Sequence, residues 1–329
     1  MMTSEAKTVA APAQIIDDIG VSKLARDTDT WLEDGNIVLV AGTRAFRVYK
    51  GLLAAQSSMF ADMFFASRPQ ADELFEGCPV VRLSDSPEEL KHLLDVLIPN
   101  VRQRVYFPDE EHYTFTQLSS FVRLGHKYGI VDVEQQALAC LKTYFTNKFD
   151  LWESFCPGLF GYRHAALCLS SGIEAIHLAR LTATPEMLPV AFYICALRGE
   201  AVLDGWTRAD GTVEHLAPED LRRAIKGFGT LRFESHRLLT DQFDVTVSVT
   251  CTTPAICNLI LGRNYLCQLD DRSPWPLHPW QQYISLPDLC KQCSYHLTEH
   301  SRAERRKLWR RLPAIFDLLN EHGLEWEIA

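Results

Sequence analysis

The chain has 329 residues, a formal net charge of −9 at pH 7, 47% hydrophobic residues and 23% charged residues. This length is sufficient for about two domains, and this apolar content for packed cores without disulfide staples. The acidic balance opposes non-specific attraction to nucleic acid or anionic lipid, so neither is an expected partner.

The first segment, residues 1–27, is small and polar and contains Ala11-Pro12-Ala13. Such a composition cannot bury enough apolar surface to fold alone, so the segment is expected to be disordered. Ile15, Ile16 and Ile19 share one helical face, which favours a short docking helix within it. Order is predicted to begin near Trp31.

Residues 36–65 are predicted to form a β-hairpin followed by helix. An apolar, β-branched run from Asn36 ends at Gly42, and RAFRVYK then alternates from Arg44 to Lys50. This alternation on both sides of a glycine turn is typical of a hairpin. From Gly51 to Phe65 the apolar residues recur at helical spacing.

The pattern continues with a short strand and three helices. Residues 80–83 are predicted to form the strand, and Ser86 with Pro87 marks a helix start, where Ser86 is expected to cap. Residues 115–128 and 131–145 are two amphipathic helices separated by Gly129. After Asp150 the pattern is mostly helical. The sequence therefore predicts an α+β fold, with a small sheet and helical cluster in residues 28–148 and a mainly helical region in 149–329.

Several linked motifs run through residues 30–148. An acidic turn enters the first strand as Asp34-Gly-Asn-Ile-Val-Leu-Val, and the hairpin ends as Phe46-Arg-Val-Tyr-Lys. The spacing L-x-x-x-S-x-x-F-x-x-M-F begins at Leu53, and residues 80–90 and 124–128 continue the match. Together these motifs resemble the BTB (POZ) domain, and in particular the fungal BTB-domain family.

The resemblance implies a non-enzymatic protein-interaction module. Within the family, the expected roles are a substrate adaptor for a cullin-type ubiquitin ligase and a scaffold or transcription-related dimer. The partners would be proteins, among them a cullin or a second copy of the chain. The commonest nucleotide-binding, zinc-protease and serine-hydrolase motifs are absent from the sequence.

Family members that act as transcription factors have a charged pocket at the dimer interface, and this chain departs from that pattern. The matching positions are Asn36, where the family has an aspartate, and Lys50, which keeps the basic residue; the usual histidine is Tyr49. The acid has become an amide, so the charge pair is lost. Asn36, Tyr49 and Lys50 remain the candidate interaction residues, and dimerisation is left open.

The cysteines give the one candidate metal site. Cys251-x5-Cys257 and Cys290-x2-Cys293 are the spaced pairs, and Cys267, His296 and His300 are substitutes if one ligand is wrong. Zn²⁺ favours four sulfur or imidazole ligands in a tetrahedron, and four protein ligands make a structural site. The other interpretation is free buried thiols that pack as small hydrophobes. Residues 263–283 show little periodicity and would struggle to bury a core unaided.

The cysteines and the amino-terminal segment indicate the cellular compartment. Their spacing is irregular, and residues 1–26 lack the continuous apolar core of a signal peptide. No stretch approaches 18 consecutive apolar residues, so no membrane span is expected. These features favour reduced or metal-bound thiols in the cytoplasm or nucleus.

A basic segment near the carboxyl end, Arg302 to Arg311, gives the alternative function. Ser301 and Glu304 are predicted to form a capping box at its start, and Pro313 to limit its extent. The alternative is a zinc-stapled nucleic-acid binder, or a metal-dependent enzyme, in the carboxyl-terminal half. The favoured interpretation is a solvated basic face lying against an acidic protein.

Overall fold

The structure of the chain is a computed structural model. It describes residues 23–66, 73–98, 113–154, 171–208, 210–243, 247–267, 276–279 and 288–327. The fold mixes α and β structure, with a five-stranded sheet and many helices. The chain divides into two compact units, Met1–Arg104 and Val105–Ala329.

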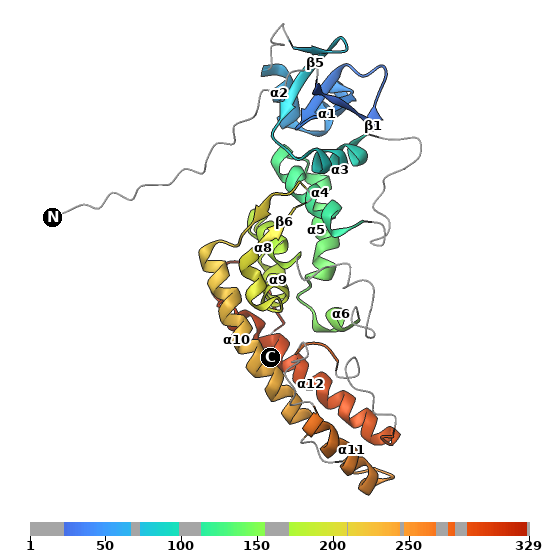
Figure 1. The fold of residues 1–329 in the computed structure, drawn as a ribbon, viewed down its shortest axis with the longest axis vertical. Coiled ribbons are helices and arrows are strands. Elements are labelled where there is room, and N and C mark those ends of the chain that lie inside the picture. Colours follow the sequence, from blue (N-terminus) through green and yellow to red (C-terminus); the bar gives the residue numbers. More distant parts are fainter. Residues whose placement is uncertain are drawn as a thin grey trace, which may run out of the picture. The chain divides into compact units, whose positions relative to one another are not determined.

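The first unit is built on the five-stranded sheet (Figure 1). Its strands lie in the order β1-β3-β2-β5-β4. Their bounds are β1 Ala25–Trp31, β2 Ile37–Ala41, β3 Arg44–Val48, β4 Leu74–Phe75 and β5 Cys78–Leu83. β2 pairs antiparallel with β3 and parallel with β5. All five residues of β2 are buried, as expected for the central strand of a covered sheet.

The predicted hairpin is confirmed. Ile37 pairs with Val48 and Ala41 with Arg44, so the turn consists of Gly42 and Thr43. Gly42 has a φ of 54°, in the left-handed region that glycine adopts without steric cost.

The predicted helix over residues 51–65 is two helices, α1 Lys50–Gln56 and α2 Ser58–Ala66. Ser57 is extended between them, with φ −144° and ψ 118°. Its hydroxyl accepts the Phe60 N–H at 3.0 Å, so this serine begins a new helix where periodicity alone predicted continuation.

Helix α3, Pro87–Leu97, contacts β1 and β2 and buries four leucines. Ser86 occupies the predicted N-cap position, but its side chain makes no capping bond. The Ser86 hydroxyl lies 3.1 Å from the Glu88 carboxylate, which binds it in place of the backbone.

Two strands of the sheet were not predicted. β1 begins at Ala25, before the expected start of order at Trp31, and β4 has only two residues. Asp27 on β1 is buried, and its carboxylate accepts the N–H groups of Asp29 and Thr30. Polar residues of this kind give no strand periodicity. The predicted docking helix around Ile15 lies outside the described residues.

The second unit begins with a helix pair, α4 Phe115–Tyr128 and α5 Val131–Tyr144, at the predicted positions. Thr114 and Gln117 form a capping box at the start of α4. Gly129 ends it with a φ of 65°, which is the usual glycine position after a helix.

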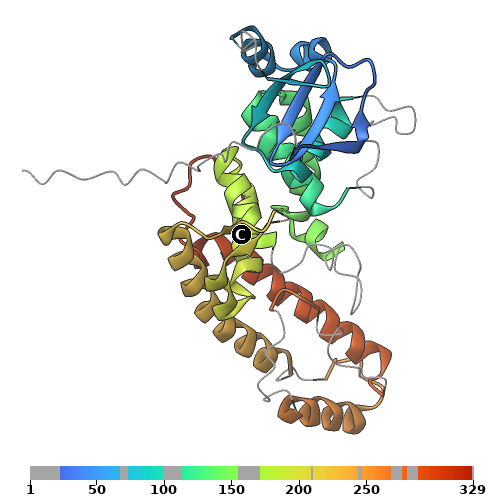
Figure 2. The same cartoon turned by 45° about the horizontal axis from the view of Figure 1, so that its top comes forward.

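The remaining elements of this unit follow along the chain after α5. They are α6 Phe149–Ser154, α8 Ser171–Leu181, the 3₁₀ helices η3 Pro185–Met187 and η4 Gly199–Asp204, α9 Leu188–Ala196, β6 Trp206–Thr207, β7 Val213–Glu214, α10 Pro218–Phe243, α11 Pro254–Cys267 and α12 Lys291–Ile315. All nine residues of α9 are buried, between contacts with α8, α10 and α12. Figure 2 shows α10 and α12 as the long helices, with α11 near the end of one and the start of the other.

The capping box predicted at Ser301 is wrong. α12 begins ten residues earlier, at Lys291, and Ser301 is buried inside the helix. Pro313 also lies inside the helix, which continues to Ile315. Leu308, Trp309 and Leu312 are fully buried, so the apolar face predicted for this segment is confirmed.

No described helix combines the length and apolar character that a membrane crossing requires. The division into units places α4 and α5 with the carboxyl-terminal helices. The predicted domain over residues 28–148 therefore includes residues of both units, and its independent folding stays a prediction.

Candidate metal centre and interaction residues

The four predicted metal ligands lie on two helix starts. Cys290 is the N-cap residue of α12, and its Sγ accepts the Cys293 N–H at 3.4 Å. Residues three apart share one side of a helix, so Cys290 and Cys293 present their sulfurs together. The N-terminus of a helix carries partial positive charge, which favours an anionic sulfur there.

The second pair, Cys251 and Cys257, lies just before and just inside the start of α11. The Cys251 N–H donates to the Ser248 carbonyl at 2.8 Å, which closes a tight turn before the helix. Cys257 lies in the first turns of α11, with its N–H on the Thr253 carbonyl at 3.0 Å. The Thr253 hydroxyl lies 3.3 Å from the Cys257 Sγ. The looser five-residue spacing thus spans a turn and a helix start.

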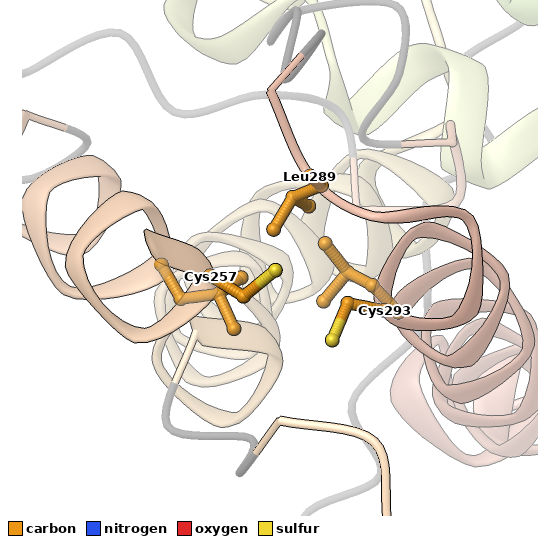
Figure 3. Close-up of a cluster of buried hydrophobic side chains, with 5 residues drawn as sticks. Cys257, Leu289 and Cys293 are labelled. Atoms are coloured by element: carbon orange, nitrogen blue, oxygen red, sulfur yellow. The ribbon is translucent and has the colours of Figure 1, made fainter. Parts of the chain in front are cut away.

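The structure brings the two pairs together. The four Sγ atoms all lie within 4.8 Å of one another, and those of Cys251 and Cys290 are 3.7 Å apart. Figure 3 shows Cys257 and Cys293 reaching from α11 and α12 into the same small core, beside Leu289. Cys257 and Cys293 are buried, whereas Cys251 and Cys290 are half-buried.

The cluster is electrostatically uneven. The backbone N–H groups of Cys293 and Thr252 lower the pKa of Cys290 to about 5. Burial raises the pKa of Cys293 to about 12 and also raises that of Cys251. Backbone donors at a helix start favour the thiolate, which is the form of cysteine that binds a metal ion.

Neither of the two substitute histidines belongs to this group. His296 is exposed on α12, and His300 is half-buried one turn further along the same helix. The Cys267 side chain lies outside the described part of the chain. Most of the aperiodic stretch 263–283 lies outside it too.

The predicted interaction residues lie together at the start of α1. The Asn36 side-chain oxygen accepts the Lys50 N–H at 2.8 Å, so this amide satisfies the first backbone donor of the helix. The Tyr49 hydroxyl donates to Asp34 at 2.5 Å, and this bond raises the pKa of Tyr49. The Lys50 ammonium reaches the Phe64 carbonyl at 3.2 Å, at the end of α2.

Comparison with known proteins assigns no family. No protein-family model matches the chain, and no curated protein is similar to it. The function of these residues must therefore be inferred from their own geometry and chemistry.

The described residues form several charge networks that the sequence did not predict, and two are examples. In one, Arg123 on α4 joins Glu174 on α8 and Glu214 on β7, at 2.6 and 3.0 Å. In the other, α12 arginines bind carboxylates: Arg302 and Arg306 bind Asp150, and Arg305 binds Glu153. Charged residues far apart in sequence carry no signal of pairing, so only the fold identifies these partners.

Proposed function

We propose that the chain is a non-enzymatic protein-interaction protein whose first half, through α5, is a BTB domain. The observation that carries the proposal is the order of elements. A hairpin, two helices, a strand parallel to β2, a further helix and a helix pair follow one another from Ile37 to Tyr144. The motifs that carry the resemblance predict the same order of elements.

The contact surface proposed in the first unit consists of the exposed apolar residues of α2 and the start of α1. Phe65 is 92% exposed and Met59 is 50% exposed, both on α2. Lys50 contacts Phe64, the neighbour of Phe65, and so lies beside this apolar end. Phenylalanine and methionine are enriched at protein interfaces, whereas lysine is depleted there, so the exposed Phe65 and Met59 support this surface.

A charged-pocket mode is not favoured, because Asn36 carries no charge and is engaged with the backbone of Lys50. We therefore place the interaction on the apolar α2 surface. Two protein partners follow from the family resemblance, a cullin and a second copy of the chain.

The nucleic-acid alternative is less well supported. Arg302, Arg305 and Arg306 on α12 are paired with carboxylates. Phosphate binding would have to break these ion pairs before it gained any counterion release. The enzyme alternative is weak for a different reason: four cysteine ligands would leave a zinc ion no open position for water or substrate.

The test is binding by the purified full chain, measured by light scattering for self-association and by titration with a purified cullin amino-terminal region. We expect micromolar or tighter affinity for one of them, and Phe65→Glu should weaken it at least tenfold, about 1.4 kcal/mol. The matched control is Phe233→Glu on α10, which changes another exposed phenylalanine, 69% exposed, in the other unit.

Equal losses from Phe65→Glu and Phe233→Glu would remove the α2 surface from the proposal. A constant monomer mass together with no cullin binding up to tens of micromolar would reject the proposed function itself.

A further inference from the structure

Free thiols packed as small hydrophobes explain only half of the cysteine cluster. Cys257 and Cys293 are buried among Leu261, Leu289 and Leu297, as apolar packing predicts. Cys251 and Cys290 are only half-buried, yet their sulfurs lie 3.7 Å apart and face the same point. Cys251 and Cys290 pack against the edge of this core, but apolar packing does not require all four sulfurs to lie within 4.8 Å of one another.

We propose that the thiolates of Cys251, Cys257, Cys290 and Cys293 bind one Zn²⁺ ion as a structural centre that fastens α11 and the loop before it to the first turn of α12. This site is independent of the proposed interaction surface on α2. Loss of either proposal therefore leaves the other standing.

The spacing of the sulfurs fits a tetrahedral ion. Zn–S bonds of about 2.3 Å in a tetrahedron place the sulfurs about 3.8 Å apart. The Cys251–Cys290 separation of 3.7 Å already has this value, and no pair exceeds 4.8 Å. The remaining adjustment, on the order of 1 Å, is within reach of side-chain rotation.

The negative charge of a zinc–thiolate centre would also be stabilised at this site. Zn²⁺ and four thiolates form a centre of net charge −2, and each thiol that enters as S–H releases its proton to solvent. Cys290 and Cys293 lie at the N-terminus of α12 and Cys257 in the first turn of α11, where backbone N–H groups and the helix dipole stabilise negative charge. The Cys293 N–H to Cys290 Sγ hydrogen bond is one such contact.

The ion would complete a core that is otherwise small. The buried members of this cluster are three leucines and two cysteines, joined by partly buried Val247 and Ile260. Metal–thiolate bonds add folding free energy where apolar burial is scarce. The elements they fasten are α11 and the start of α12, while α8 and α9 have their own extensive core.

Metal analysis of the full chain, purified under reducing conditions without added metal, is the first test. We expect close to one zinc per chain. Iron in its place, two disulfides, or a folded metal-free chain that takes up no zinc from a buffered solution would each overturn the proposal.

The ligands are tested by cobalt(II) substitution, which gives intense visible bands when the ion is tetrahedral and near-ultraviolet charge-transfer bands when thiolates bind it. Cys290→Ser should weaken metal affinity more than about 100-fold, beyond what loss of an outer-shell partner costs. Cys251→His should keep the ion with shifted bands, because imidazole is also a zinc ligand. His296→Gln, one turn from Cys293, is the matched control and should bind normally.

Hydrogen exchange tests the structural role of the ion on the wild-type chain, so the result does not depend on variants that fold poorly. Hydrogen exchange of the wild-type chain, with and without a chelator, should show lost protection in α11 and the first turns of α12 and unchanged protection in α8 and α9. Unchanged protection at α11 after complete metal removal would contradict the structural role, and metal loss from His296→Gln but not from Cys290→Ser would contradict the ligand set.

Discussion

Phe60 and Phe65 lie on the same short helix, α2, and differ in burial. Phe60 is fully buried and stacks on Phe64, with ring centroids 5.7 Å apart, whereas Phe65 is 92% exposed. Removal of a buried aromatic ring costs the transfer free energy and leaves a cavity.

Phe60→Ala should therefore lower the free energy of unfolding by about 3–5 kcal/mol. Phe65→Ala on the same helix should change it by less than about 0.5 kcal/mol. Chemical denaturation of both variants measures the difference. A loss below about 1 kcal/mol for Phe60→Ala would mean that this ring does not carry the core of the first unit.

At the scale of elements, α10 packs closely against Phe316, the residue that follows α12, and the contact is made at Gly227. A Cβ added to Gly227 would lie 2.0 Å from the Phe316 ring, whereas one added to Gly229 meets nothing within 4 Å. Both glycines are inside α10 and have helical backbone.

Gly227→Ala should destabilise the chain by about 1–3 kcal/mol through overpacking. Gly229→Ala, two residues away, should stabilise it by up to about 1 kcal/mol through helix propensity. Thermal or urea unfolding of the two variants gives the sign directly. The same sign for both would show that Phe316 moves aside freely.

The β6–β7 hairpin is held by Glu214. Burial alone would raise the pKa of this carboxyl, but the contact with His177 and the charges of Arg123 and Arg208 lower it to about 2. A carboxylate with a lowered folded-state pKa stabilises the protein above its unfolded pKa of about 4.3 and loses that contribution as pH falls.

Glu214→Gln should cost roughly 2–3 kcal/mol at pH 7, and its difference from wild type should shrink between about pH 4.5 and 2. Urea unfolding across this pH range measures it. The control is Glu200→Gln at an exposed position on η4, which should follow wild type throughout. A pH-independent cost would assign Glu214 a packing role instead.

Elements were predictable where apolar spacing was strong. The bounds of α4 and the registers of β2 and β3 follow from periodicity and glycine turns. The break at Ser57 depends on one hydroxyl–backbone bond, and the start of α12 depends on a cysteine as N-cap, a residue outside the usual capping set. Such single hydrogen bonds leave no periodic trace in a sequence.

At the scale of the whole molecule, we expect residues 23–148 to fold alone, because the proposed BTB domain is complete within them. The fragment starts before β1 so that Asp27 keeps its contacts with Asp29 and Thr30. Circular dichroism should show one cooperative thermal transition. If fragment 105–329 is cooperative and 23–148 is not, α4 and α5 belong to the carboxyl-terminal folding unit.

The candidate sites were predictable in composition but not in arrangement. Cys290-x2-Cys293 indicated half of a metal site from spacing alone. That the start of α11 faces the start of α12 depends on how both pack on α10, which no local pattern records. Likewise, the amide of Asn36 reaches Lys50 because the hairpin pairs Ile37 with Val48.

The strand order of the first unit has a consequence for aggregation. The apolar hairpin lies inside the sheet, and its outer positions are taken by β1, which is mostly polar, and by the two-residue β4. Short or charged strands at a sheet edge discourage pairing with a foreign strand. Cleavage after Trp31 would remove β1 and uncover the hydrogen-bonding edge of β3, so a chain shortened at that point should form β-rich aggregates that the longer chain avoids.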